Sequence, residues 1–235
     1  MKYAGMIKQS LVDYPGKIAA VLFTRGCNFR CPYCHNSDLL VKTNRGETVD
    51  IEEILNYLEL RKSFLDAVVI SGGEPTLNEA LIEDLQRIKE MGYLLKLDTN
   101  GSNCHMLEQL LERELLDYVA MDIKAPLDIK KYEEASGKIT AQAFCDVRNS
   151  IHLLQQSSME VEFRTTVVPV LHSYEDIADI ARYIEDADLY SLQQFHPGHT
   201  LEPSFSALAP YSREEMEIIA EKCQPYVKRI RVLNI

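Results

Sequence analysis

Short runs of consecutive apolar residues recur along the chain at regular intervals, and each run has the length of a β-strand. An uninterrupted apolar run is typical of a strand buried on both faces, as in a parallel sheet. We predict six such strands and a short closing strand, over residues 18–23, 67–71, 94–99, 118–123, 161–168, 191–195 and 229–233. The turn signal Pro15-Gly16 precedes the first run, so residues 1–17 are expected to form a lead-in hairpin.

Between these runs the apolar residues change to a spacing of three and four, which predicts helices between the strands. The first helix is expected to begin at Asp50, which has Glu53 at the spacing of a capping box, and the next helix is expected to end near Gly92. Later helices are predicted from apolar positions 144, 147, 151 and 154, and from capping-box pairs at Ser173 with Asp176 and at Ser212 with Glu215.

Strands that alternate with helices in this way predict βα units, a parallel sheet and right-handed connections. Six units predict an α/β fold of the partial (β/α)6 barrel type. No linker-like change of composition divides the 235 residues, so we expect one domain. Its parts would be the lead-in over 1–17, the barrel core over 18–200, and a C-terminal helix and strand over 201–235.

The charge and cysteine content narrow the classes of function. With 25 Lys and Arg against 36 Asp and Glu, the net charge of −11 disfavours binding to nucleic acid or to an anionic membrane. Residues 1–10 lack the apolar core of a signal peptide, and no stretch approaches the roughly 20 apolar residues of a membrane span, so a cytoplasmic protein is expected. In that reducing compartment, six Cys indicate metal or redox chemistry rather than disulfides. Three of them stand alone and are expected to be core residues: Cys104, Cys145 and Cys223.

The other three cysteines, Cys27, Cys31 and Cys34, have the spacing CxxxCxxC directly after the first predicted strand. Thiolates are the ligands that iron–sulfur clusters and zinc select, and residues so close in sequence can converge on one centre. A centre with four ligand positions that is held by three cysteines keeps one position open, which favours a reactive site over a purely structural one. The alternatives are a Cys3His zinc site that uses His35, and three unrelated buried thiols.

Polar residues follow the ends of the other predicted strands, where the catalytic groups of parallel α/β barrels gather. In chain order they are Gly72-Gly73-Glu74-Pro75, Asp98-Thr99-Asn100-Gly101, Asp122 with Lys124, Arg164, and His196. Each also has a structural interpretation. The glycine pair could be a plain tight turn, the two aspartates could pair with Lys124 or Arg164, and His196 could be a core histidine. Carboxylates at the ends of apolar strands should in any case have cationic partners.

The motif CxxxCxxC with Tyr33 just before its third Cys resembles the radical S-adenosylmethionine (radical SAM) enzymes. The resemblance implies that Cys27, Cys31 and Cys34 hold a 4Fe-4S cluster whose free iron binds S-adenosylmethionine, which the reduced cluster cleaves to methionine and a 5'-deoxyadenosyl radical. It also implies that Gly72-Gly73-Glu74-Pro75 contacts the methionine amino group.

Two further motifs, Asp98-Thr99-Asn100-Gly101 and Met121-Asp122-Ile123-Lys124, resemble those with which glycyl-radical-enzyme activases hold the methionine end of S-adenosylmethionine. In the pyruvate formate-lyase activase they also help to bind a monovalent cation, which adds such a cation to the expected cofactors. The resemblance makes Asp98, Thr99, Asp122 and Lys124 cofactor-binding residues, places His196 at the ribose and Tyr33 near the adenine. Arg164 would bind a carboxylate or neutralise one of the aspartates.

The ending Cys34-His35-Asn36 is typical of these activases, and the opening of the chain, residues 3–16, resembles the activating proteins of anaerobic ribonucleoside-triphosphate reductase. No Cys lies between Cys34 and Gly72, so a ferredoxin-like insert with a second cluster is not expected. The resemblance implies a radical SAM oxidoreductase that takes a Cα hydrogen from a glycine of that reductase, with flavodoxin or ferredoxin as electron donor. The alternatives are an activase of another glycyl radical enzyme, a 7-carboxy-7-deazaguanine synthase, where Cys-Asp-Thr would be typical, and a zinc-binding interaction domain.

Overall fold

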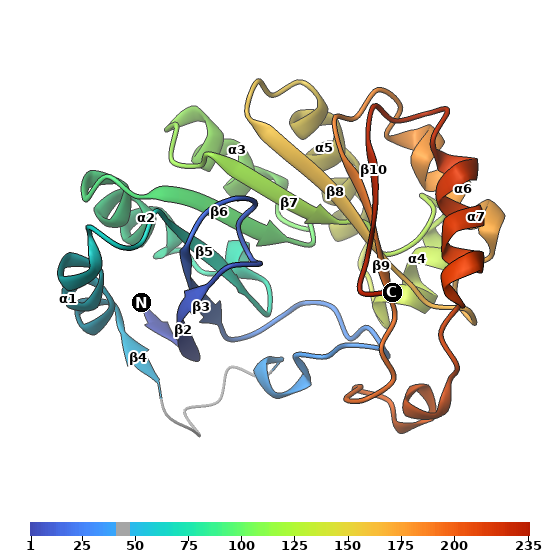
Figure 1. Ribbon diagram of the computed structural model, residues 1–235, viewed down its shortest axis with the longest axis horizontal. Coiled ribbons are helices and arrows are strands. Elements are labelled where there is room, and N and C mark those ends of the chain that lie inside the picture. Colours follow the sequence, from blue (N-terminus) through green and yellow to red (C-terminus); the bar gives the residue numbers. More distant parts are fainter. Residues whose placement is uncertain (41–47) are drawn as a thin grey trace. The chain divides into compact units, whose positions relative to one another are not determined.

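A computed structural model describes residues 1–40 and 48–235 of the chain, and strands alternate with helices along it as predicted (Figure 1). The chain divides into two compact units, each built from several stretches of sequence. The first unit comprises Met1–Cys27, Asp38–Thr99 and His105–Val119, and the second comprises Asn28–Ser37, Asn100–Cys104 and Ala120–Ile235. The single domain therefore stays a prediction. None of the helices in the described ranges is long and apolar enough to cross a membrane.

The strands of the first unit confirm the predicted parallel arrangement. β3 (Ala19–Thr24), β5 (Ala67–Gly72) and β6 (Leu94–Thr99) are parallel neighbours in this order, with Val21 opposite Val69 and Ile70 opposite Leu97. β2 (Gly5–Ser10) pairs antiparallel with β3, which confirms the lead-in hairpin. The apolar side chains of β3 and β5 are almost fully buried, as expected for strands covered on both faces.

A second, two-stranded pairing in this unit was not predicted. β1 (Lys2–Tyr3) pairs antiparallel with β4 (Val49–Asp50), and each strand has two residues, too short for a periodic signal. Asp50 is therefore the last residue of a strand as well as the N-cap of the helix that follows. Its side chain makes no capping hydrogen bond, so the capping box predicted for Asp50 and Glu53 is wrong.

The helices of the first unit follow their strands. They are α1 (Ile51–Arg61), the 3-10 turn η2 (Pro75–Leu77), α2 (Leu81–Glu90) and α3 (Cys104–Glu112), whose first residue is assigned to the second unit. α1 buries Ile51, Ile54 and Leu58 at the predicted spacing. Gly92 has φ +89°, the left-handed conformation with which helices often end, as predicted. A 3-10 turn, η1 (Ser37–Leu39), has residues in both units.

The strands of the second unit are β8 (Glu160–Val167), β9 (Tyr190–Gln194) and β10 (Ile230–Leu233), which are parallel neighbours. β7 (Tyr118–Asp122) contributes its last three residues to this unit and its first two to the other. Directly after β7, the Ile123 amide donates to the Arg164 carbonyl oxygen of β8 at 2.8 Å. The six predicted strands and the short closing strand are thus all present, with ends that differ by one residue at most.

The helices of the second unit are α4 (Ile129–Ser136), α5 (Ala141–Gln155), α6 (Tyr174–Tyr183), the 3-10 turn η3 (Pro203–Ala207) and α7 (Arg213–Cys223). Both capping boxes predicted here, at Ser173 and at Ser212, are confirmed. α4 was not predicted, since its eight residues carry few apolar positions. Cys145 lies exposed on α5, so its prediction as a core residue is wrong, whereas Cys223 is fully buried.

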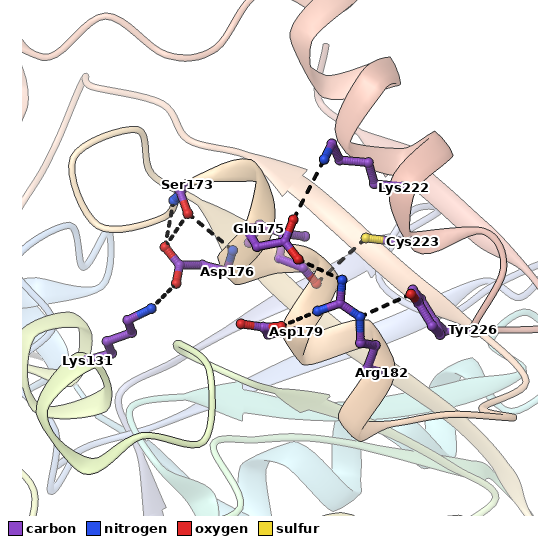
Figure 2. Close-up of polar contacts among 10 residues, drawn as sticks. Lys131, Ser173, Glu175, Asp176, Asp179, Arg182, Lys222, Cys223 and Tyr226 are labelled. Atoms are coloured by element: carbon purple, nitrogen blue, oxygen red, sulfur yellow. Dashed lines mark hydrogen bonds and ion pairs between the residues drawn. The ribbon is translucent and has the colours of Figure 1, made fainter.

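Polar contacts tie α6 to its neighbours in the second unit (Figure 2). Arg182 of α6 binds Glu175 at 2.6 Å and donates to the Tyr226 hydroxyl at 3.0 Å. Lys131 of α4 pairs with Asp176, the carboxylate that also completes the capping box at Ser173. Exposed pairs of this kind each contribute little to stability, but they link α6 to α4 through Lys131 and to α7 through Lys222, which lies 3.7 Å from Glu175.

Candidate functional site

In the first unit, two glycines bring the end of β5 against the backbone that leads to Cys27. A Cβ on Gly72, which has φ +112°, would lie 2.5 Å from the Thr24 amide nitrogen, and a Cβ on Gly73 would lie 2.2 Å from the Gly26 carbonyl oxygen. The Gly73 amide donates to the Thr24 carbonyl at 3.1 Å. Because no side chain fits there, the glycine pair fixes the chain immediately before Cys27.

The carboxylate of Glu74 is buried and holds the turn that follows β5 through hydrogen bonds. Its side chain is 1% exposed, and its Oε1 accepts hydrogen bonds from the Thr76 amide at 3.1 Å, the Thr76 hydroxyl at 2.5 Å and the Thr99 hydroxyl at 2.7 Å. The structure thus brings together two predicted site residues, Glu74 and Thr99. The Glu74 amide in turn donates to the Gly26 carbonyl oxygen at 2.8 Å, so both the side chain and the backbone of Glu74 hold the segment next to Cys27.

Asp98, at the end of β6, is paired with a cation from its own strand. The Lys96 ammonium lies 2.7 Å from Asp98 Oδ1, and both side chains are largely buried. Residues two apart on a strand point to the same face, which places Lys96 and Asp98 side by side. The expectation that Asp98 has a cationic partner is confirmed, although this partner is Lys96, which sequence reasoning missed.

In the second unit, Cys31 and Cys34 lie in a loop that is anchored by α4. The Arg30 amide donates to the Ser136 carbonyl at 2.7 Å, and a Cβ on Gly137, which has φ +76°, would lie 2.0 Å from the Arg30 carbonyl oxygen. Within the loop the Cys34 amide donates to the Cys31 carbonyl at 3.0 Å. This turn sets the relative positions of the two cysteines.

Tyr33, between these cysteines, is buried at 3% exposure. Among the described residues its hydroxyl has no hydrogen-bond partner. Burial raises the pKa of the phenol, and the nearby Cys31 thiol raises it further, so the hydroxyl stays protonated. A buried hydroxyl without a partner is costly, and a bound ligand or water would remove that cost.

Asp122, Lys124 and Arg164 form one partly buried charged group, as the sequence suggested. Asp122 Oδ1 accepts from Arg164 Nε at 2.8 Å, and Oδ2 accepts from Lys124 Nζ at 3.1 Å. Burial raises the pKa of the Asp122 carboxyl, but its two cationic neighbours outweigh this and lower it from 3.8 to about 2. Burial likewise lowers the pKa of Lys124, and Asp122 raises it well above its usual range. The group carries one carboxylate and two cations, so it has a net positive charge.

The backbone of Lys124 is held by His172, a residue that belongs to no motif or strand-end position in the sequence. Its Nδ1 accepts from the Val168 amide at 3.0 Å, so its Nε2 carries the proton and donates to the Lys124 carbonyl oxygen at 2.8 Å. Burial lowers the pKa of His172 to about 4, which keeps the ring neutral. The Lys124 amide donates to the Tyr132 hydroxyl at 3.3 Å. These contacts fix the backbone of Lys124 on both sides.

His196 lies exposed in the loop after β9, and the structure therefore does not place it as a core histidine. Two further histidines of the second unit are close to this loop. His35 stacks on Phe195 with ring centroids 6.3 Å apart, and His199 contacts the Ser37 hydroxyl at 2.9 Å. Burial lowers the pKa of His35, and the neighbouring His196 contributes in the same direction.

The predicted site residues thus fall into two sets. The first unit holds Cys27, Gly72, Gly73, Glu74, Asp98 and Thr99, and the second holds Cys31, Tyr33, Cys34, Asp122, Lys124, Arg164 and His196. None of the three motif cysteines forms a disulfide. Within residues 1–40 and 48–235, no three His, Cys, Asp or Glu side chains are grouped as a metal-ion site.

Comparison with known proteins identifies the class. The chain matches the family model of the radical SAM superfamily over residues 21–187, more than half of its length. The chain therefore belongs to the radical SAM superfamily and is an enzyme of the α/β class that the alternation of strands and helices predicted. Membership implies S-adenosylmethionine and an iron–sulfur cluster.

Two relatives narrow the family. A Methanocaldococcus jannaschii protein with the provisional name glycyl-radical enzyme activating enzyme MJ1227 is 38% identical over 233 residues, 99% of this chain and 95% of that protein. The pyruvate formate-lyase-activating enzyme of Clostridium pasteurianum is 34% identical over 197 residues, 81% of this chain and 79% of that enzyme. Within the superfamily, the chain belongs with the glycyl-radical-enzyme activating enzymes.

The chain is similar in fold to a solved structure. The crystal structure of Streptococcus suis SuiB bound to precursor peptide SuiA matches with a TM-score of 0.68 over 91% of this chain, at 14% identity. This chain spans about half of SuiB, since the match covers 48% of that protein. At this identity the likeness concerns the fold alone.

Proposed function

We propose that Cys27, Cys31 and Cys34 hold one 4Fe-4S cluster. Thiolates bind the iron of such clusters, whereas metals that prefer oxygen ligands would not select three cysteines, and none of the three is in a disulfide. The glycine pair at β5 fixes the backbone before Cys27, and the turn between Cys31 and Cys34 sets the other two. Three cysteines leave the fourth ligand position of such a cluster to another molecule.

That molecule would be S-adenosylmethionine. The backbone at Gly72, Gly73 and Glu74 would receive the methionine amino group, with Asp98 and Thr99 beside it. The net positive group of Asp122, Lys124 and Arg164 suits the methionine carboxylate. The buried Tyr33 would lie near the adenine, and His196 near the ribose. When bound, the reduced cluster and S-adenosylmethionine supply a 5'-deoxyadenosyl radical that abstracts a hydrogen atom.

The role of the chain's own residues is to hold and orient these groups. The Asp122 carboxylate fixes the Lys124 ammonium and the Arg164 guanidinium, while His172 and Tyr132 hold the Lys124 backbone. A group that is fixed before the ligand arrives loses little entropy on binding. This part of the site therefore needs little rearrangement when S-adenosylmethionine enters.

The proposed substrate is a glycine of a partner glycyl radical enzyme, from which the Cα hydrogen is taken. The observation that carries this proposal is the 38% identity to MJ1227 over 99% of the chain, together with the name of that protein. The resemblance of residues 3–16 supports anaerobic ribonucleoside-triphosphate reductase as the partner, in the cytoplasm, with flavodoxin or ferredoxin as electron donor.

The cluster and its reaction are tested with Cys31→Ser, and with Cys145→Ser as a matched control on the exposed face of α5. After anaerobic reconstitution, the unaltered protein and the control should bind iron and sulfide and, with dithionite, convert S-adenosylmethionine to 5'-deoxyadenosine. Cys31→Ser should lose this conversion. Full conversion by Cys31→Ser, or one zinc and no iron in the unaltered protein, would contradict the proposal.

The partner is tested by electron spin resonance. After the reduced enzyme and S-adenosylmethionine are mixed with the candidate reductase, a glycyl radical doublet should grow in the reductase and should be missing when its radical glycine is changed to Ala. Conversion of S-adenosylmethionine without any glycyl radical would leave the cluster chemistry intact and would reject this partner. Formation of a deazaguanine product from the pterin substrate would instead favour the synthase.

A further inference from the structure

Lys96 is a buried lysine that contacts Asp98 and the ring of Tyr118, both in its own unit. It is 3% exposed, its ammonium lies 2.7 Å from Asp98 Oδ1, and it sits 5.7 Å from the centre of the Tyr118 ring. Tyr118 in turn packs on Tyr14, with ring centroids 5.6 Å apart. A buried ammonium is costly unless it is paired, and the carboxylate and the ring face both stabilise it. Lys96 is therefore held at Asp98 by strong local constraints.

This pairing bears on the monovalent cation that the resemblance to the pyruvate formate-lyase activase led us to expect. A carboxylate whose charge is already balanced by an ammonium or a guanidinium attracts a further cation less strongly. Asp98 has Lys96 as its counter-charge, and Asp122 has both Lys124 and Arg164. Each carboxylate thus already carries at least one protein cation, and the residues present do not fit a bound sodium or potassium ion.

We infer that Lys96 takes the place of a monovalent cation at Asp98, so that S-adenosylmethionine binding by this enzyme requires neither sodium nor potassium. The inference rests on the proposed function, because it concerns the same site. It goes further by assigning a role to a residue that no motif includes. A metal cation at Asp98 would lie close to the buried Lys96 ammonium, and the two like charges would repel each other.

The test measures S-adenosylmethionine affinity of the reconstituted enzyme by equilibrium dialysis, with sodium, potassium or tetramethylammonium as the buffer cation. The ionic strength is kept at ~0.1 M so that charge screening does not change. Three variants are compared: Lys96→Met, which removes the charge at similar length; Lys96→Arg, which keeps it; and Lys89→Met, which removes the Lys of a partly exposed Lys–Asp pair in the same unit.

The unaltered enzyme, Lys96→Arg and Lys89→Met should change their affinity by less than about twofold among the three cations. Lys96→Met should bind about tenfold more weakly in tetramethylammonium and recover in sodium or potassium, because a small cation can then reach Asp98. Its thermal unfolding temperature should also rise with sodium or potassium and should not rise with tetramethylammonium.

A tenfold gain in affinity of the unaltered enzyme with sodium or potassium would overturn the inference, whether or not Lys96→Met folds. So would a folded Lys96→Met that shows no cation response. If the unaltered enzyme neither binds nor cleaves S-adenosylmethionine in any of the three cations, the proposed function itself fails. The two failures are therefore distinguishable.

Discussion

Replacing Glu74 tests how far the loop after β5 depends on one buried carboxylate. In Glu74→Ala, three donors lose their acceptor: the Thr76 amide and the hydroxyls of Thr76 and Thr99. A hydrogen bond to a charged group contributes about 1.5–3 kcal/mol, and the three are not additive because the hydroxyls can rotate toward other acceptors. We expect Glu74→Ala to lower the free energy of unfolding by about 3–5 kcal/mol.

Glu74→Gln removes the negative charge of the side chain but keeps an oxygen that can accept the same hydrogen bonds. The amide oxygen can still accept from the same donors, so a loss of about 1–2 kcal/mol is expected. Glu79→Gln, an exposed glutamate a few residues on, should change the free energy of unfolding by less than about 0.5 kcal/mol. The measurement is urea unfolding of the anaerobic apo-protein, followed by circular dichroism.

The loss of unfolding free energy should be largest for Glu74→Ala, smaller for Glu74→Gln and smallest for Glu79→Gln. This order follows from the hydrogen bonds that Glu74 Oε1 accepts. If Glu74→Ala cost less than about 1 kcal/mol, the three bonds would not hold this loop and the reasoning would be refuted. Equal losses for Ala and Gln would show that the charge, and not the acceptor geometry, stabilises the segment.

Three other changes have expected outcomes in the same unfolding assay. Gly73→Ala should destabilise by about 2–4 kcal/mol, since its Cβ would lie 2.2 Å from the Gly26 carbonyl oxygen, whereas Gly198→Ala meets nothing within 4 Å and should be neutral. Asp122, whose pKa is lowered from 3.8 to about 2, contributes about 2 kcal/mol above pH 4 that is lost as the pH falls toward 2, and Asp122→Asn should remove this dependence. His172, whose pKa is lowered from 6.5 to about 4, should cause stability to fall as the pH drops from 6.5 to 4, and His172→Gln should remove that slope. A variant with the pH profile of the unaltered protein would contradict the corresponding assignment.

The sequence predicted the strands well because the apolar runs carry their signal locally. β6 matches its predicted range residue by residue, and the capping boxes at Ser173 and Ser212 are present. The capping box at Asp50 failed because that residue ends β4, whose partner β1 lies almost fifty residues earlier. Pairings of such short strands depend on long-range contacts that no local pattern reveals.

The candidate site likewise contains residues that could be predicted from the sequence and residues that could not. Asp122 and its partners Lys124 and Arg164 could be read from their places at strand ends, and the structure pairs them. Lys96 could have been paired with Asp98 from the two-residue period of a strand, but a single lysine inside an apolar run is not by itself a sign of a functional site. His172 could not be found, because its role is to bind a backbone carbonyl that only the folded chain brings near it.

The anchoring of the Cys31–Cys34 loop on α4 bears on how the enzyme matures. The Arg30 amide and the tight approach of Gly137 are protein contacts that need no metal, so they can form while the chain is folding. Zinc fingers, by contrast, fold only when their metal binds. Here the loop that carries Cys31 and Cys34 is held to α4 by contacts of the protein itself, so its anchoring does not depend on metal ligation alone.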